Sequence, residues 1–175
     1  MENNTGTIVK KFNTILALNL CNRCGYVVEK NGMIEFGEWN LNPYHRFESG
    51  GMKYVRFVKC LSEIMPDIIF FKIVKFYRAG MIHMYKMNPY LAHLESFCCE
   101  RNIEYESVTF SQLKEFSQAE TKMDFVTLAN KKFKKELTYN QESQAVALWI
   151  LEWGKQNRLP KNVESITLPK VEVSC

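Results

Sequence analysis

The stretch that decides the fold runs from Asn13 to Val28 and reads Asn-Thr-Ile-Leu-Ala-Leu-Asn-Leu-Cys-Asn-Arg-Cys-Gly-Tyr-Val-Val. An apolar run, Ile15 to Leu20, precedes a polar turn containing Gly25 and a second β-rich run, which predicts a hairpin that opens a sheet. The first run is too continuously apolar for a strand with one face in solvent, so we expect it at the centre of the sheet. Asn19 then lies near the end of this central strand.

The remaining segments predict a mixed fold. Asn31-Gly32 indicates a two-residue turn between strands at 26–29 and 33–41. Pro66 ends one helix, and Asn88 can cap another with Pro89 at its first position. Helices are expected over 52–65, 89–101, 111–116, 123–135 and 140–155, and strands over 68–74 and 103–108. Three antiparallel strands followed by parallel crossovers form an α/β fold with a mixed five-stranded sheet flanked by helices.

Length and composition indicate one soluble domain. The chain has 175 residues, of which 46% are apolar and 24% charged. We expect a flexible N-terminal tail over 1–12, the domain over 13–157 and a C-terminal tail over 158–175. A net charge of +4 permits a nucleic-acid partner without requiring one. The sequence has no run of about 18 apolar residues and no signal-peptide pattern, so we expect no membrane association and a cytoplasmic location.

The chain contains six cysteines, and Cys21-Asn-Arg-Cys24 forms a C-x-x-C motif beside Asn19. A structural zinc site needs four ligands, and no second suitable pair is evident in the sequence. Two free thiols in a turn are therefore the expected state, with metal binding or redox pairing as the alternative.

The order of several segments resembles that of the phage and bacterial RuvC-like Holliday-junction resolvases. The resemblance lies in Ile15-Leu-Ala-Leu-Asn-Leu with Gly25-Tyr-Val-Val, Gly37-Glu-Trp-Asn-Leu, Arg46-Phe-Glu-Ser-Gly-Gly-Met-Lys-Tyr-Val-Arg-Phe, Asp67-Ile-Ile-Phe-Phe-Lys-Ile-Val-Lys-Phe, Leu91-Ala-His-Leu-Glu-Ser-Phe-Cys and Asn140-Gln-Glu-Ser-Gln-Ala-Val-Ala-Leu-Trp. It implies an RNase H-like fold, a role in DNA recombination, and a homodimer built mainly from the helix near 89–101.

The resemblance also implies four acidic metal ligands: one at the end of the first strand, one in the fourth strand, and two that are three residues apart at the start of the last helix. In this sequence these positions are Asn19, Lys72, Gln141 and Gln144. None is an acid, although Mg²⁺ prefers carboxylate oxygens. The Lys72 ammonium would repel a cation about 4 Å away by roughly 4 kcal/mol per unit charge at an effective dielectric constant of 20.

Taken singly, each of these residues has an ordinary interpretation. Asn19 is typical of turns, Lys72 of edge strands, and Gln141 and Gln144 of the first turn of a helix. Only their joint placement at the matched positions indicates a degenerate metal site.

The segment expected to contact DNA phosphates is also altered. Where the family has a Lys-Lys-His run and a Gly-Lys-Gly loop, this chain has Ser111 to Lys122, with only Lys114 left of the early pair. The other candidate nucleic-acid-binding residues are Lys75, Arg78, Lys131 and Lys132. For the last two, a solvated charged helix face is the alternative.

These observations favour a catalytically inactive homologue of the resolvases that retains a binding role, either for branched or structured nucleic acid or for a protein partner, without a cofactor. One alternative is an active Holliday-junction endonuclease that uses Mg²⁺ or Mn²⁺ and recruits other acids, such as Glu142 or Glu35. The other alternative is a pure protein-interaction module.

Overall fold

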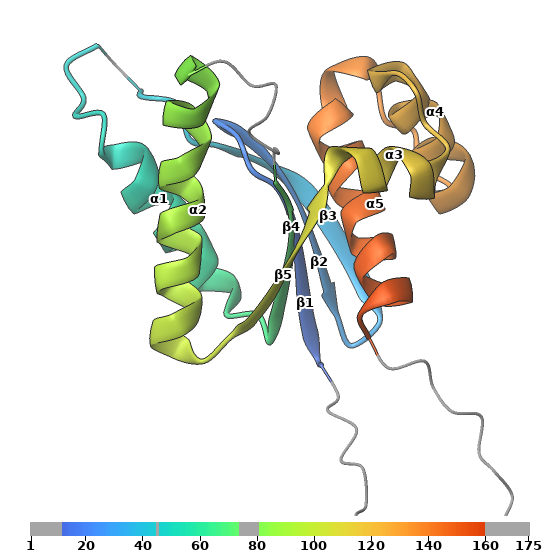
Figure 1. The fold of residues 1–175 in the computed structure, drawn as a ribbon, viewed down its shortest axis with the longest axis horizontal. Helices are drawn as coiled ribbons and strands as arrows, with labels where there is room; N and C mark the ends of the chain where they lie inside the picture. Colours follow the sequence, from blue (N-terminus) through green and yellow to red (C-terminus); the bar gives the residue numbers. More distant parts are fainter. Residues whose placement is uncertain (1–11, 45, 74–80, 160–175) are drawn as a thin grey trace, which may run out of the picture.

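The computed structural model describes residues 12–44, 46–73 and 81–159, except for the side chains of 81–88. The predicted tails, 1–12 and 158–175, lie almost wholly outside these residues, and so do Lys75 and Arg78. The described chain forms a five-stranded sheet in the order β3-β2-β1-β4-β5, with helices on both faces (Figure 1).

The elements follow one another in the predicted alternation. They are β1 (Thr14–Asn19), β2 (Arg23–Lys30), β3 (Met33–Asn40), α1 (Met52–Ile64), β4 (Ile68–Ile73), α2 (Met81–Arg101), β5 (Glu104–Thr109), α3 (Phe110–Ser117), α4 (Lys122–Phe133), the 3-10 helix η2 (Tyr139–Gln141) and α5 (Glu142–Asn157). The first three strands pair antiparallel, whereas β4 pairs parallel with both β1 and β5. The predicted mixed α/β fold is therefore confirmed.

None of the described helices is both long and apolar enough to pass through a lipid bilayer.

Strand β1 is the centre of the sheet, as its apolar run predicts. Ile15 and Ala17 pack in the core beneath α3, α4 and α5, whereas Leu16 and Leu18 pack on the opposite face beneath α1 and α2. Successive side chains of a strand point to opposite faces, so a strand covered on both sides has to be apolar at every position.

Helix α2 differs from the prediction at its start. It begins at Met81, so Pro89 lies inside it and the expected N-cap at Asn88 is wrong. A proline inside a helix removes one hydrogen bond and crowds the carbonyl group four residues earlier, so it usually marks a helix boundary; here the residues on both sides of Pro89 are nevertheless helical. The other predicted helices begin and end within about two residues of their expected limits, which is the usual uncertainty of helix ends.

Gly25 also differs from the prediction, because it lies inside β2, paired with Asn19, and not in the turn. The glycine is needed for close approach: a Cβ atom at this position would lie 2.1 Å from the backbone oxygen of Ser143 in α5. At the other end of α5, a Cβ atom on Gly154 would lie 2.3 Å from the ring of Phe70. Helix α5 therefore contacts the sheet closely at both of its ends.

We expect Gly25→Ala to lower the free energy of unfolding by about 2–3 kcal/mol, because the added methyl group must push the first turn of α5 off the sheet. Gly50→Ala is the matched control, since a Cβ atom there meets nothing within 4 Å. Urea denaturation of both variants measures the difference. Equal stability of the two variants would contradict the close contact.

Candidate functional site

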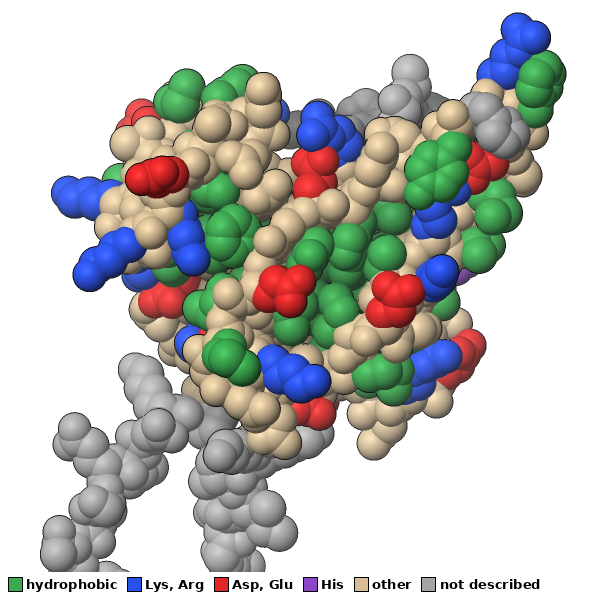
Figure 2. Space-filling model, turned by 180° about the vertical axis from the view of Figure 1, so that it is seen from behind, with side chains coloured by type: hydrophobic (Ala, Val, Ile, Leu, Met, Phe, Trp, Pro, Cys, Tyr) green, Lys and Arg blue, Asp and Glu red, His purple; other side chains and the backbone are tan. Residues whose placement is uncertain are grey.

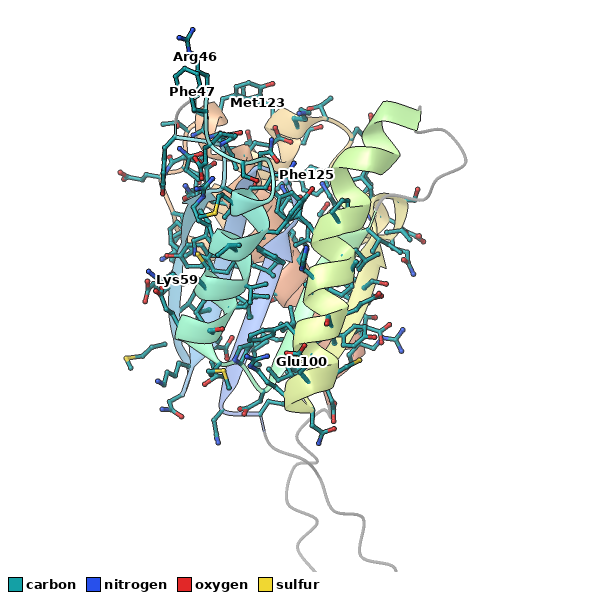
Figure 3. All side chains as sticks on the ribbon, turned by 90° about the vertical axis from the view of Figure 1, so that its left-hand side faces the viewer. Arg46, Phe47, Lys59, Glu100, Met123 and Phe125 are labelled. Atoms are coloured by element: carbon teal, nitrogen blue, oxygen red, sulfur yellow. The ribbon has the colours of Figure 1, made fainter. Side chains whose placement is uncertain are left out.

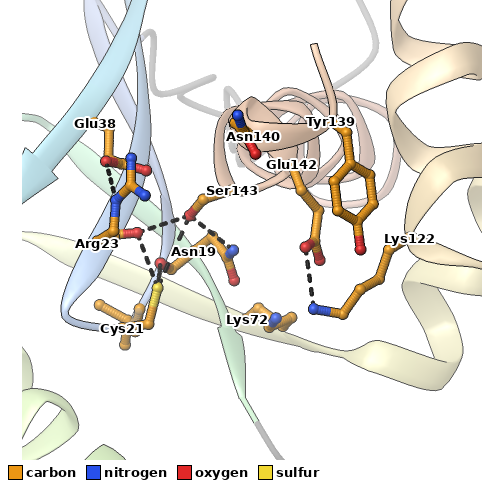
Figure 4. Close-up of a pocket in the computed structure, with 11 residues that line it drawn as sticks. Asn19, Cys21, Arg23, Glu38, Lys72, Lys122, Tyr139, Asn140, Glu142 and Ser143 are labelled. Carbon is orange, nitrogen blue, oxygen red and sulfur yellow. Dashed lines mark hydrogen bonds and ion pairs between the residues drawn. The ribbon is translucent and has the colours of Figure 1, made fainter. Parts of the chain in front are cut away.

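A pocket of about 470 Å³ opens between the start of α5 and the end of the sheet where β1 and β4 finish (Figure 4). Four strands, α4 and α5 with the preceding η2 contribute to it, directly or through the turn after β1. Its lining residues are Asn19, Leu20, Cys21, Arg23, Glu38, Lys72, Lys122, Tyr139, Asn140, Glu142 and Ser143.

The sheet places Asn19 and Lys72 side by side. Leu18 and Phe71 are partners in the parallel β1–β4 ladder, and Asn19 and Lys72 are the next residues of these strands. Because side chains alternate between faces, Asn19 lies on the same face as Ala17, beneath α5, and Lys72 likewise follows Phe70 on that face. Both polar side chains therefore enter the pocket from its floor.

Ser143 joins the start of α5 to the sheet through three hydrogen bonds. Its hydroxyl donates to the Arg23 carbonyl oxygen at 2.9 Å and accepts from the Gly25 N–H at 2.8 Å and from Asn19 Nδ2 at 3.0 Å. A hydroxyl has one proton and two lone pairs, so Ser143 uses its full capacity. This count also fixes the orientation of the Asn19 amide, because only its NH₂ group can donate to an oxygen whose own proton is already used.

The charged residues of the pocket form two ion pairs, and one cation is left over. Arg23 pairs with Glu38 at 2.7 Å, and Lys122 pairs with Glu142 at 3.0 Å (Figure 4). Lys72 makes no ion pair with any residue that the structure describes; its ammonium lies 5.4 Å from the centre of the Phe110 ring. Three cations against two carboxylates give the pocket an excess of one positive charge.

Burial lowers the pKa of Lys72 from its ordinary value, and the nearby Lys122 adds to this, while Cys21 and Glu142 act in the opposite direction. The pKa of Lys122 is instead raised, mainly by its hydrogen bond to Glu142. The environment therefore penalises the charge on Lys72 and stabilises the charge on Lys122.

The two thiols of the C-x-x-C motif face different surroundings. Cys21 lines the pocket and donates to the Arg23 carbonyl oxygen at 3.0 Å, whereas Cys24 is fully buried in the core beneath α1 and α2. Both are free, and burial raises the pKa of each. Protonated thiols are poor nucleophiles and poor metal ligands.

The structure brings two of the four predicted metal-ligand positions into the pocket. Asn19 and Lys72 line it, but Gln141 and Gln144 do not. Gln141 closes the capping box of η2 by accepting from the Thr138 N–H at 2.9 Å, and its Nε2 donates to Gln144 Oε1 at 3.4 Å. The pocket-facing pair with the same three-residue spacing is one position earlier.

That pair is Asn140 and Ser143. A three-residue spacing is compatible with this pair as well as with Gln141 and Gln144, so the spacing alone does not distinguish the two pairs. The packing of α5 on the sheet determines which pair faces the pocket.

The predicted basic residues lie in three kinds of place. Lys114 sits beside the pocket, with its ammonium 5.8 Å from the Phe110 ring that Lys72 also approaches. Lys132 pairs with Glu152 at 3.1 Å and covers Trp149, so it has a structural role. Lys131 is exposed on α4. Figure 2 shows that several Lys and Arg side chains project from one side of the molecule.

Sequence reasoning missed the pocket residues Arg23, Glu38, Lys122 and Tyr139. No motif marks them, because each becomes part of the site only when the sheet and α4 are assembled. No group of three or more His, Cys, Asp or Glu side chains that could hold a metal ion occurs in the described part of the chain. With both acids already paired to cations and the Lys72 ammonium in the same lining, the pocket does not fit a pair of Mg²⁺ ions.

No protein-family model matches the chain, and no curated protein sequence matches it. Solved structures do match. RuvC from Thermus thermophilus in complex with a Holliday junction substrate aligns with a TM-score of 0.58 and 13% identity, over 82% of this chain and 96% of that chain. The yeast mitochondrial Holliday junction resolvase Ydc2 aligns with a TM-score of 0.52 and 11% identity, over 82% of this chain and 78% of that chain.

The fowlpox virus Holliday junction resolvase gives a TM-score of 0.56 and 7% identity, over 82% of this chain and 99% of that chain. At such identities the likeness establishes the fold, which is the RNase H-like fold of the RuvC-type resolvases.

We expect Ser143→Ala to lower the free energy of unfolding by about 2 kcal/mol, because a backbone N–H, a carbonyl oxygen and the Asn19 amide lose one shared partner. Ser62→Ala is the control: Ser62 is exposed, and among the described residues its hydroxyl donates only to the Val58 carbonyl oxygen in its own helix, so the loss should stay within about 0.5 kcal/mol. Chemical denaturation measures both. A loss for Ser143→Ala as small as the control's would contradict the network.

We expect Lys72→Met to raise the free energy of unfolding at pH 7. Because the pKa of Lys72 is lower in the folded state, the unfolded chain binds more protons between the folded and unfolded pKa values, so the stability of the native protein rises with pH across that range. The advantage of the methionine variant should therefore shrink as the pH rises. Thermal melts at pH 7 and pH 10 test this, with the exposed Lys59→Met as control.

Proposed function

We propose that this protein binds branched DNA at the pocket end of its sheet and does not cleave it with divalent metal ions. The RuvC-type fold supports the first part, since a protein of the same fold has been solved on a Holliday junction substrate. The second part rests on the Lys72 ammonium, which forms no ion pair with a described residue and lies next to Asn19, where a cation would have to bind.

An active nuclease would need carboxylates that converge on that place. Glu142 lines the pocket, but its carboxylate is held by Lys122. Glu35 lies on β3 one residue before Phe36, which packs toward α5, so Glu35 points to the opposite face of the sheet, where it accepts from the Tyr26 hydroxyl. Of the two acids proposed for the active alternative, only Glu142 therefore lines the pocket, and its carboxylate is already in an ion pair.

The end of the molecule at which β1 and β4 finish also has exposed side chains that suit nucleic acid. Phe47 and Met123 lie at the same end of the molecule, opposite Glu100 (Figure 3). Phe47 is 80% exposed and Tyr44 is 72% exposed. Exposed aromatic rings offer stacking surfaces for bases, while Lys114 supplies a cation for phosphate.

A homodimer through α2 gains no support from the described part of that helix. Between Pro89 and Arg101 its exposed residues are Ala92, His93, Ser96, Cys99, Glu100 and Arg101. Permanent dimer interfaces are more apolar than this. A protein partner would find apolar surface at a different place, the start of the edge strand β3, where Met33 is 74% exposed and Ile34 is 42% exposed.

We expect the full chain to bind a four-way junction more tightly than a linear duplex of the same sequence, with an affinity that falls steeply as salt is added. Lys114→Met should reduce the slope of log affinity against log salt by about one unit, since one phosphate contact is lost. The control is Lys59→Met, a 76% exposed lysine on α1. Fluorescence anisotropy over a salt series gives both slopes.

The same junction incubated with Mg²⁺ or Mn²⁺ should remain intact. Cleavage that Glu142→Gln abolishes would overturn the proposed inactivity and establish the metal-dependent nuclease. An absence of binding even at low salt would instead leave the protein-interaction role of this fold.

A further inference from the structure

The pocket contains a buried hydrogen-bond acceptor for which the described residues supply no donor. This acceptor is Oδ1 of Asn19, a residue that is only 7% exposed. The Ser143 network holds the NH₂ side of the same amide, so Oδ1 cannot exchange places with Nδ2. A buried acceptor left unpaired costs about 1–3 kcal/mol, which a ligand that brings a donor would recover.

The pocket also offers a donor without a partner. Lys72 lines it next to Asn19, and no described residue accepts a hydrogen bond or forms an ion pair with its ammonium. Asn19 Oδ1 and Lys72 Nζ lie on neighbouring strands in the floor of the pocket, so they are the acceptor and the donor available to a ligand that reaches this floor.

An acceptor beside a donor does not suit the simplest ligands. A phosphate oxygen would be attracted by Lys72 but repelled by the Asn19 carbonyl oxygen and by Glu142. A divalent cation would suit Asn19 but be repelled by Lys72 and Lys122. The ligand that fits has an acceptor and a donor next to each other and carries little charge.

One wall of the pocket is aromatic. Tyr139 lines it and is 51% exposed, so part of its ring is free for stacking. The volume, about 470 Å³, lies within the usual range for small-molecule sites. A flat ring with polar edges can therefore stack on Tyr139 while its edge meets the floor.

We infer that the pocket takes up a single unpaired nucleobase. Base edges carry neighbouring donors and acceptors, and in a continuous duplex the Watson–Crick partner occupies them. The pocket therefore selects an extrahelical nucleotide at a branch point over paired bases. This inference rests on the proposed function, because a DNA backbone bound around the pocket delivers the base.

The test compares two four-way junctions of the same sequence, one fully paired and one with a single unpaired nucleotide at the branch. The full chain should bind the second about tenfold more tightly, as expected for one stacked and hydrogen-bonded base. With 2-aminopurine as the unpaired nucleotide, its fluorescence should fall on binding, because the base moves onto a tyrosine ring.

Two variants locate the effect. Lys72→Met and Tyr139→Ala should each reduce the tenfold preference to about threefold or less. Their controls, Lys114→Met and Tyr44→Ala, change a lysine and an exposed tyrosine that do not line the pocket, so the preference should persist even where overall affinity falls.

The outcomes separate this inference from the proposed function. Binding of both junctions with equal affinity overturns the base pocket and leaves branched-DNA binding in place. A preference that survives both Lys72→Met and Tyr139→Ala assigns the base to another site and also overturns the inference. Failure to bind either junction overturns the proposed function.

Discussion

The docking of the first turn of α5 onto β1 and β2 determines the geometry of the pocket end of this protein. It depends on one hydroxyl, that of Ser143, which satisfies a carbonyl oxygen, a backbone N–H and the Asn19 amide at once. It also depends on the missing side chain of Gly25, which lets two backbones come together. The contact is neutral, because a hydroxyl, an amide and two backbone groups hold it together without a charged side chain.

This neutral contact between α5 and the sheet changes the chemistry of the pocket next to it. In a metal site, the negative charge of several carboxylates is balanced by the bound ions. Here the balance comes from the chain itself, through the ion pairs Arg23–Glu38 and Lys122–Glu142. What remains for a ligand is one ammonium group and one amide oxygen. Such a set favours recognition through hydrogen bonds over Lewis-acid catalysis.

The sequence predicts much of the fold because burial leaves a direct pattern. The continuous apolar run of β1 requires cover on both faces, and the structure provides it. Prediction was weaker where two arrangements share one pattern. Residues 140 and 143 have the same spacing as 141 and 144, and only packing selects the first pair. Similarly, a glycine at position 25 indicates a turn by its residue type. In the structure a glycine is needed there because a helix more than a hundred residues later in the chain contacts its backbone.

Helix α5 meets the sheet without clearance at both ends, through Gly25 below its first turn and through its own Gly154 above the Phe70 ring. Close contacts at both ends restrict tilting and sliding of α5, so the wall of the pocket that this helix forms is preorganised before any ligand binds. A ligand that enters this pocket would meet a fixed wall, so any conformational adaptation on binding would have to take place in the ligand.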